Sequence, residues 1–252
     1  RGPGPPRPPG GEQAAPLTPE IATGRSEKRL VRARLDMVAA ADPRAVDAGV
    51  AVLARGGSAV DAAIAVQMVL NVVEPQSSGV GGGGFLLHHD GASGRLAAYD
   101  GRETAPARIA AEPFRGADGR PLPFLERVDS GLSVGTPGLL RMLELAHARH
   151  GRLPWATLFE PAIRLADEGF EISPRLHRSI AAAAARICPH PAPAALLLAP
   201  GGCEAKPAGT RLRNPQLAAS LRRIAAQGAD ALYPGPMAEA IAATVRSHPQ
   251  RP

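Results

Sequence analysis

The sequence is poor in aromatic residues and contains no long apolar run. Aromatic side chains make up only 3% of its 252 residues, and much of its 44% hydrophobic fraction is alanine. We therefore expect a globular core that buries a modest area per residue. No apolar run approaches the roughly 20 residues that are needed to cross a bilayer, so the sequence predicts no membrane-spanning helix.

Cysteines are also few, and no signal-peptide pattern is present. The two cysteines, Cys188 and Cys203, lie in an irregular stretch that permits a disulfide without requiring one. The chain starts at Arg1 rather than at a methionine and stops at Pro252 just after a helical pattern, so we expect a fragment of a longer reading frame. The localisation therefore stays open between a periplasmic or secreted protein and a cytoplasmic one.

Basic residues outnumber acidic ones by 29 to 23, which gives a formal net charge of +6. An excess of this sign raises the question of nucleic-acid binding. The basic residues are nearly all arginines scattered through predicted helices, and they lack the interleaved aromatic residues that stack on bases. The pattern predicts that nucleic acid is not a partner.

Proline, glycine and arginine dominate residues 1–34, which show no periodicity and are predicted to be disordered. The short apolar segment 36–41 predicts a first strand, and residues 107–132 and 188–209 predict irregular surface segments. Apolar periodicity and terminating glycines predict helices at 44–55, 58–73, 139–150, 174–187, 215–227 and 237–246. Within 155–167 we expect two short helices, because Pro161 interrupts the pattern. Four helix starts place a capping side chain directly before a proline, at Asp42, Thr136, Ser173 and Asn214.

Three polar residues near helix ends have both a structural and a functional interpretation. Asp61 stands three residues after Ser58, as in a capping box, and this favours a structural role over a catalytic one. His147 and His150 lie one helical turn apart, as two metal ligands can. No third ligand stands at a suitable spacing, so we predict solvated helix-end histidines and no metal.

The sequence is organised around residues 71–106. A helix-like run ends at Glu74, a glycine cluster follows, and residues 85–87 and 95–99 form the arms of a predicted hairpin around the turn 90–94. The second arm delivers Asp100, Arg102 and Glu103 to a position just past the end of a strand. Functional side chains are often held at such positions.

The consecutive glycines Gly81, Gly82, Gly83 and Gly84 lose so much chain entropy on folding that we expect a close approach to their backbone. A phosphate-binding loop requires a strand before the glycines and a helix after them. Here the order is inverted, so we predict no nucleotide and no other cofactor. The alternative is a glycine turn that lets a helix pack tightly on a sheet.

Arg102 has two interpretations that its spacing alone leaves open. Beside Asp100 and Glu103 it forms either a surface ion-pair cluster of little energetic consequence or a guanidinium fork held ready for a carboxylate ligand.

Several motifs, in this order, resemble the gamma-glutamyltranspeptidase family. They are GGSAVDAAIA at 56–65, VEP at 73–75, GVGGGGF at 79–85 and DGRETAP at 100–106. The likeness continues through SVGTPG at 133–138 and PAIRLADEG at 161–169, and more weakly to about Val245. Because order and spacing match together, the resemblance is more specific than any single glycine motif, and it covers most of the chain after Leu35.

The resemblance implies an N-terminal-nucleophile hydrolase with an α+β fold, an αββα sandwich, of which residues 35–252 would be an incomplete, helix-rich large-subunit domain. In that family a precursor cuts itself into a large and a small subunit. The new N-terminal threonine of the small subunit then takes the γ-glutamyl group from glutathione and passes it to water or to an amino acid. The implied partners are glutathione or another γ-glutamyl donor and the small subunit of the same precursor.

By motif, Arg102 is the arginine that binds the α-carboxylate of the donor, with Asp100 and Glu103 as supporting residues and Gly81 to Gly84 near the site. No catalytic residue is predicted in this chain, because none of its threonines stands in a Thr-Thr-His type of start: Thr18, Thr23, Thr104, Thr136, Thr157, Thr210 and Thr244. We expect the chain to be inactive alone. The alternatives are a relative that acts as a glutaryl- or cephalosporin-type acylase or a poly-γ-glutamyl transpeptidase, and a non-catalytic, helix-rich binding module.

Overall fold

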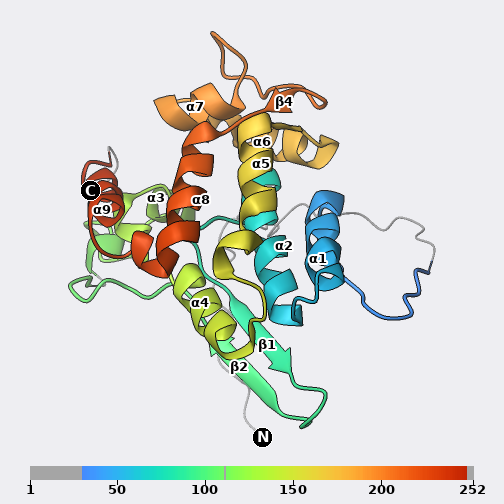
Figure 1. The fold of residues 1–252 in the computed structure, drawn as a ribbon. Coiled ribbons are helices and arrows are strands. Elements are labelled where there is room, and N and C mark those ends of the chain that lie inside the picture. The colour runs from blue at the N-terminus through green and yellow to red at the C-terminus, as the bar shows by residue number, and fades with distance from the viewer. Residues whose placement is uncertain (1–29, 111, 249–252) are drawn as a thin grey trace, which may run out of the picture. The chain divides into compact units, whose positions relative to one another are not determined.

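The computed structural model describes residues 30–110 and 112–248 (Figure 1). Most of the N-terminal segment predicted to be disordered lies outside the described residues, so that prediction stays untested. From Arg32 onward the chain forms one compact unit. Its helices are α1 Pro43–Ala54, α2 Ala59–Val73, α3 Phe124–Val128, α4 Leu139–His150, α5 Glu160–Glu168, α6 Pro174–Ile187, α7 Pro191–Leu197, α8 Pro215–Gln227 and α9 Pro236–Arg246.

The strands of this unit form two small antiparallel sheets. They are β1 Phe85–His89 paired with β2 Leu96–Asp100, and β3 Phe170–Glu171 paired with β4 Arg211–Leu212. Short 3-10 turns complete the described elements at Glu112–Phe114, Gly131–Ser133, Trp155–Leu158 and Gly228–Ala231. The predicted helix-rich α+β class is thus confirmed.

Helix α2 lies at the centre of the core, between α1 on one side and α4 and α5 on the other (Figure 1). Its residues Ile64, Met68 and Val69 are completely buried, because the sequence places apolar or alanine side chains on nearly all of its faces. The predicted capping box is confirmed: the Ser58 hydroxyl accepts from the Asp61 N–H and the Asp61 carboxylate accepts from the Ser58 N–H. Asp61 therefore has a structural role.

The predicted hairpin is confirmed, with Leu86 opposite Tyr99 in its register. Tyr99 is buried against α4. Phe85, Leu87 and Leu96 point to the other face and are about two-thirds exposed, at 69%, 71% and 67%. The hairpin thus covers α4 with one face and leaves the other uncovered in the described part of the chain.

Three of the four predicted capping starts are confirmed, at Asp42, Ser173 and Asn214. The fourth is wrong. Thr136 does not cap α4 but exchanges two backbone hydrogen bonds with Thr104, at 3.2 and 2.8 Å. Helix α4 itself has the predicted range, Leu139–His150, and begins without a side-chain cap.

The strand predicted at 36–41 is also wrong. Val38 lies against α1 and α2 rather than beside another strand, as its contact with the position of Gly49 shows. Without a neighbouring strand there is no hydrogen-bonded ladder. The irregular segment 107–132 in turn contains the short helix α3, and residues 188–209 contain α7 and a disulfide between Cys188 and Cys203.

The prediction of solvated histidines at the end of α4 is wrong, because both rings are half-buried. The Nε2 atom of His147 lies 3.5 Å from the buried carboxylate of Asp61. His150 is hydrogen-bonded to the Tyr99 hydroxyl at 2.6 Å and stacks on His88, with ring centroids 3.8 Å apart. The two histidines therefore join α4 to α2 and to the hairpin.

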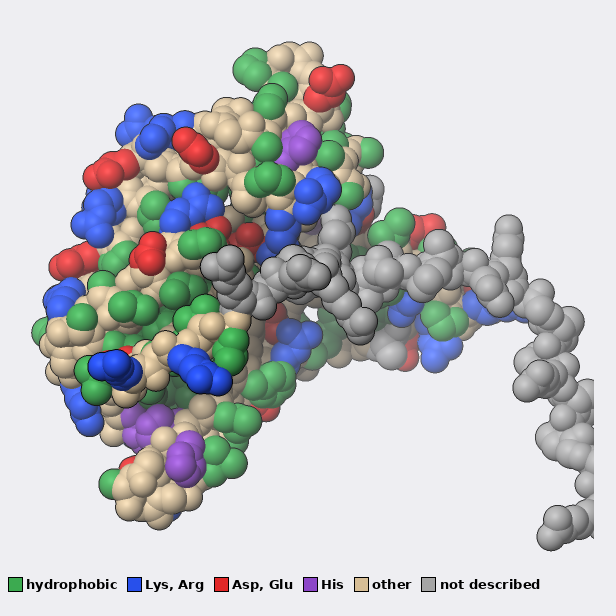
Figure 2. Space-filling model, turned by 90° about the vertical axis from the view of Figure 1, so that its right-hand side faces the viewer, with side chains coloured by type: hydrophobic (Ala, Val, Ile, Leu, Met, Phe, Trp, Pro, Cys, Tyr) green, Lys and Arg blue, Asp and Glu red, His purple; other side chains and the backbone are tan. Residues whose placement is uncertain are grey.

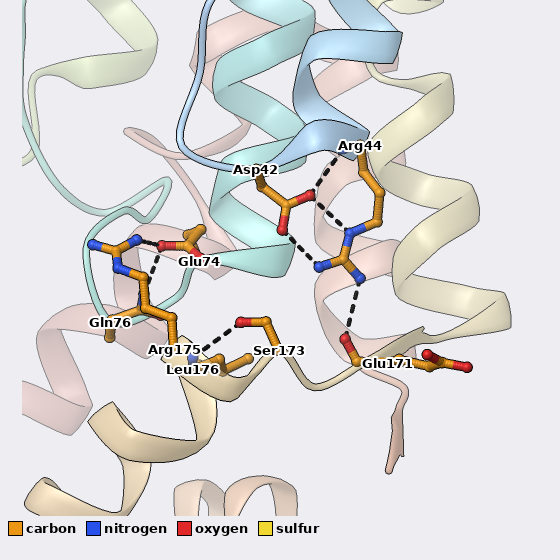
Figure 3. A network of polar contacts seen from close by, with 8 residues as sticks. All are labelled: Asp42, Arg44, Glu74, Gln76, Glu171, Ser173, Arg175 and Leu176. Atoms are coloured by element: carbon orange, nitrogen blue, oxygen red, sulfur yellow. Dashed lines mark hydrogen bonds and ion pairs between the residues drawn. The ribbon is translucent and has the colours of Figure 1, made fainter. Parts of the chain in front are cut away.

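Two buried carboxylates tie the ends of α1 and α2 to the chain that precedes and begins α6 (Figure 3). Asp42 accepts from Nε and Nη2 of Arg44, at 2.8 and 2.6 Å, and the same guanidinium donates to the Glu171 carbonyl. Glu74 pairs with Arg175 at the start of α6. Breaking such a buried pair leaves an uncompensated charge. The Glu74–Arg175 pair joins the end of α2 to α6, whereas the Asp42–Arg44 pair lies within the start of α1 and is joined to the chain before α6 by the Arg44 bond to Glu171.

Asp42 provides a test of this arrangement through pH. Burial alone would raise the pKa of its carboxyl group, but hydrogen bonds from the Arg44 side chain and backbone, together with the guanidinium charge, hold that pKa below its usual value. The unfolded chain therefore binds more protons at acidic pH. The stabilisation is complete above the unfolded pKa of about 3.9 and is lost as the pH falls through the lower, folded value.

We predict that Asp42→Asn lowers the free energy of unfolding by about 1–3 kcal/mol at pH 7, because the amide keeps the cap and loses the charge-assisted bonds. The difference from the unsubstituted chain should shrink as the pH falls below about 4. Urea unfolding followed by circular dichroism measures both quantities. The matched control is Asp47→Asn on the exposed side of α1. A loss that is the same at pH 3 and pH 7 would contradict the ion-pair account.

Candidate functional site

Arg102 lies just beyond β2, on the exposed segment that leads away from the hairpin. Its guanidinium Nη1 donates to Glu103 Oε2 at 2.6 Å, and the Arg102 side chain is 65% exposed. Its Nε and Nη2 groups have no hydrogen-bond partner among residues 30–110 and 112–248. One prong of the guanidinium is therefore held while the other donors stay available for a ligand.

The predicted supporting residues act at different points. Glu103 pairs with the guanidinium, as expected. Asp100 does not; its carboxylate accepts from the backbone N–H of Arg102 at 2.9 Å. Asp100 thus holds the backbone turn, and Glu103 holds the side chain.

The predicted close approach to the glycine run is made by the chain itself. Gly84 and Gly101 exchange two backbone hydrogen bonds, at 3.2 and 2.9 Å, which extend the hairpin ladder by one pair. The Gly82 carbonyl accepts from the N–H groups of Gly138 and Leu139 at the start of α4. The packing interpretation of these glycines therefore accounts for the run without a phosphate.

Glu103 lies between two glycines. A Cβ added to Gly83 would lie 2.5 Å from Glu103 Oε2, and one added to Gly135 would lie 2.9 Å from Glu103 Cβ. Neither glycine can carry a side chain without displacing the residue that pairs with Arg102. The glycine run is thus part of the support of the guanidinium.

Two surface pockets meet at Arg102 and Glu103. One, of about 510 Å³, is lined by Gln67, Ser77, Ser78 and the first three glycines of the run, Gly81 to Gly83. The other, of about 470 Å³, is lined mainly by apolar side chains. The largest of these side chains are Ile109, Phe114, Leu132 and Val134. A concave site with a few polar groups on one wall is typical of small-molecule binding.

Gln67, Ser77 and Ser78, in the wall of the first pocket, were not predicted from the sequence. Gln67 belongs to a run that has the pattern of an ordinary buried helix, and the two serines lie in the irregular segment that follows it. The one sequence signal for Gln67 is that its polar side chain interrupts the apolar pattern of α2, and this signal is weak.

Charges on the face drawn in Figure 2 alternate in sign, with Lys and Arg interspersed among Asp and Glu rather than merged into one basic surface. The expectation that nucleic acid is not a partner stays a prediction. In the described part of the chain no three His, Cys, Asp or Glu side chains gather in a way that suits a metal ion. None of the helices there is long and apolar enough to cross a membrane.

Comparison with known proteins gives consistent matches. The gamma-glutamyltranspeptidase family model matches residues 45–248. The chain is 39% identical over 210 residues to the glutathione hydrolase proenzyme of Bacillus subtilis strain 168, which covers 83% of this chain and 35% of that protein. It is 38% identical over 228 residues to the acylase ACY 1 proenzyme of Pseudomonas sp. strain SE83, covering 88% and 40%.

Among solved structures, the Helicobacter pylori gamma-glutamyltranspeptidase superposes on 84% of this chain and 60% of its own chain, with a TM-score of 0.79 and 31% identity. The chain spans about a third of the length of the curated relatives it matches. The likeness confirms the predicted N-terminal-nucleophile hydrolase fold, of which the described residues form a helix-rich α+β part. With its glycine run, its Arg102 segment and a family model that matches most of its length, this chain belongs to the gamma-glutamyltranspeptidase family.

Proposed function

We propose that this chain supplies one wall of the donor pocket of a gamma-glutamyltransferase or glutathione hydrolase, and that Arg102 binds the α-carboxylate of the γ-glutamyl group. The observation that carries the proposal is the half-satisfied guanidinium at the edge of two pockets. Glu103 holds Nη1, and Nε and Nη2 have no partner in the described residues. Arginine presents its donors in a planar fork that matches both oxygens of a carboxylate.

A purely structural role explains this arrangement poorly. An ion pair as exposed as that of Arg102 with Glu103 contributes little to stability, because water and salt screen it. The site nevertheless keeps Gly83 and Gly135 free of side chains around Glu103. Family membership likewise favours an enzyme over a helix-rich binding module.

We propose that the nucleophile is a threonine on a small subunit of the same precursor. A threonine that uses its own amino group as general base must be the first residue of its chain. Its Oγ attacks the γ-carbonyl carbon of the donor, the amide C–N bond breaks, and the leaving amine takes up the proton. The resulting acyl-enzyme ester then passes the γ-glutamyl group to water or to an amino acid.

A second candidate function is an acylase that cleaves a glutaryl-type amide. It is favoured by the 38% identity to a Pseudomonas acylase proenzyme. A glutaryl group keeps the carboxylate that we assign to Arg102 and lacks only the α-ammonium of a γ-glutamyl group. Both candidates therefore use Arg102 in the same way, and they differ in whether the ammonium contributes to binding.

We predict that Arg102→Ala in the full-length precursor weakens donor binding by about 2–5 kcal/mol where the pair is desolvated. The loss should appear mainly in the KM for γ-glutamyl-p-nitroanilide, since the carboxylate is bound alike in the ground and transition states. Arg102→Lys should retain part of the affinity, because a point charge loses the two-pronged geometry. Steady-state kinetics with both variants measures the effect.

The matched control is Arg95→Ala, which removes an exposed arginine at the far end of the hairpin. It should leave the donor KM unchanged. If both alanine variants change KM equally, Arg102 serves only the fold, and the carboxylate assignment fails.

A further prediction is that the 252-residue chain, expressed alone, neither hydrolyses γ-glutamyl-p-nitroanilide nor cuts itself. The reason is the nucleophile that we place on another subunit. Gel electrophoresis and a chromogenic assay of the repurified chain test this. Turnover that persists through repurification, or a cleaved band, would refute the placement.

The two candidate reactions are separated by comparing γ-glutamyl-p-nitroanilide with glutaryl-p-nitroanilide on the full-length enzyme. A gamma-glutamyltransferase should prefer the first by at least about tenfold in kcat/KM, which corresponds to about 1.4 kcal/mol for reading the ammonium. Arg102→Ala should impair both donors. A preference for the glutaryl donor would assign the acylase activity instead.

A further inference from the structure

Helix α2 is apolar along most of its length, but two amide side chains lie one turn apart near its C-terminal end. Gln67 Nε2 donates to Asn71 Oδ1 at 2.8 Å and to Ser78 Oγ at 2.6 Å. The Ser78 hydroxyl in turn donates to Asn71 Oδ1. These three residues form a closed hydrogen-bonded cluster, the Gln67–Asn71–Ser78 cluster, in which both amide hydrogens of Gln67 are used.

The cluster fixes one end of the loop that carries the glycine run. Residues 74–84 join α2 to β1, and Ser78 begins the part of this connection, 78–84, that carries the glycine run. Asn71 is only 3% exposed on α2. At the other end, Gly82 is bonded to the start of α4 and Gly84 to Gly101. The loop is therefore held at both ends by hydrogen bonds to separate elements.

The end of this loop that adjoins β1 lies against the residue that holds Arg102. A Cβ on Gly83 would meet Glu103 Oε2 at 2.5 Å, and Glu103 Oε2 accepts from Arg102 Nη1 at 2.6 Å. A shift of the loop would open or close the space around this carboxylate. Gln67 and Ser78 also line the same pocket of about 510 Å³ as Arg102.

We propose that the Gln67–Asn71–Ser78 cluster positions Arg102 for the donor carboxylate, acting through the glycine loop and Glu103. This inference rests on the proposed function of Arg102 and deepens it by assigning positioning residues on α2. Gln67 and Ser78 need not touch the carboxylate. They hold in place the pocket wall that lies against the Arg102–Glu103 pair. This reduces the side-chain freedom that Arg102 loses when the donor binds.

Ser78→Ala and Gln67→Met test the proposal in the full-length precursor. Both remove hydrogen bonds of the cluster, and methionine roughly keeps the volume of glutamine. We expect each variant to raise the KM for γ-glutamyl-p-nitroanilide by about five- to tenfold with kcat changed by less than about twofold, because the carboxylate is bound alike in the ground and transition states. Ser78→Thr keeps a hydroxyl group and should restore a KM close to that of the unsubstituted enzyme.

Matched controls make the same chemical changes far along the chain, on α8. They are Ser220→Ala and Gln216→Met, and both should leave KM and kcat unchanged. Thermal unfolding and self-cleavage are followed for every variant. If Ser78→Ala does not mature, Gln67→Met, whose change lies on the other side of the cluster, takes its place in the comparison.

The double variant Ser78→Ala with Arg102→Ala decides whether the cluster acts through Arg102. If it does, the double variant has the same donor KM as Arg102→Ala alone, since there is no fork left to position. Additive increases in KM would overturn the inference, as would cluster variants that behave like their controls while Arg102→Ala still raises KM. A normal KM in Arg102→Ala would instead remove the proposed function together with the inference.

Discussion

The candidate site depends on a contact between backbones at the end of the hairpin. A Cβ on Gly138 would lie 2.4 Å from the Gly101 carbonyl oxygen, and one on Gly101 would lie 2.5 Å from Met142 Cβ. Helix α4 therefore begins directly on the strand end. Since Arg102 follows Gly101 immediately, this contact sets where the guanidinium leaves the scaffold.

Glycine usually gives a chain conformational freedom, but here the glycines allow close backbone packing that holds the site in place. Each glycine of the contact gives up chain entropy on folding, and the stability that compensates comes from the core around α2, where Ile64, Met68 and Val69 are fully buried. Because glycine has no side chain, Gly83 and Gly135 leave room for the side chain of Glu103. The core thus stabilises a surface that contributes little stability of its own.

Elements that depend on local chemistry could be predicted from the sequence, and elements that depend on distant partners could not. The capping box at Ser58 and the hairpin turn have all their determinants within a few residues. The segment 36–41 has strand-like composition, but only its packing on α1 and α2 decides that it forms no ladder. Thr136 has the local signature of a cap, and its pairing with Thr104 overrides that signature.

The same division applies to the candidate site. Arg102 could be proposed as a site residue from the sequence, because its motif is contiguous and resembles that of a known family. Asp100 and Glu103 are its neighbours in the sequence, but which of them pairs with the guanidinium depends on a turn of the backbone that no sequence pattern specifies. Gln67 and Ser78 are brought to the same pocket wall only by the fold of the 75–83 segment back onto α2.

The carboxylate that we propose for Arg102 is common to glutaryl and γ-glutamyl donors, so this proposed contact does not distinguish the two. The feature that separates them, an ammonium, needs an acidic or carbonyl partner beside it. Glu103, which lines this wall, is already paired with the guanidinium, so it offers no unpaired carboxylate to that ammonium.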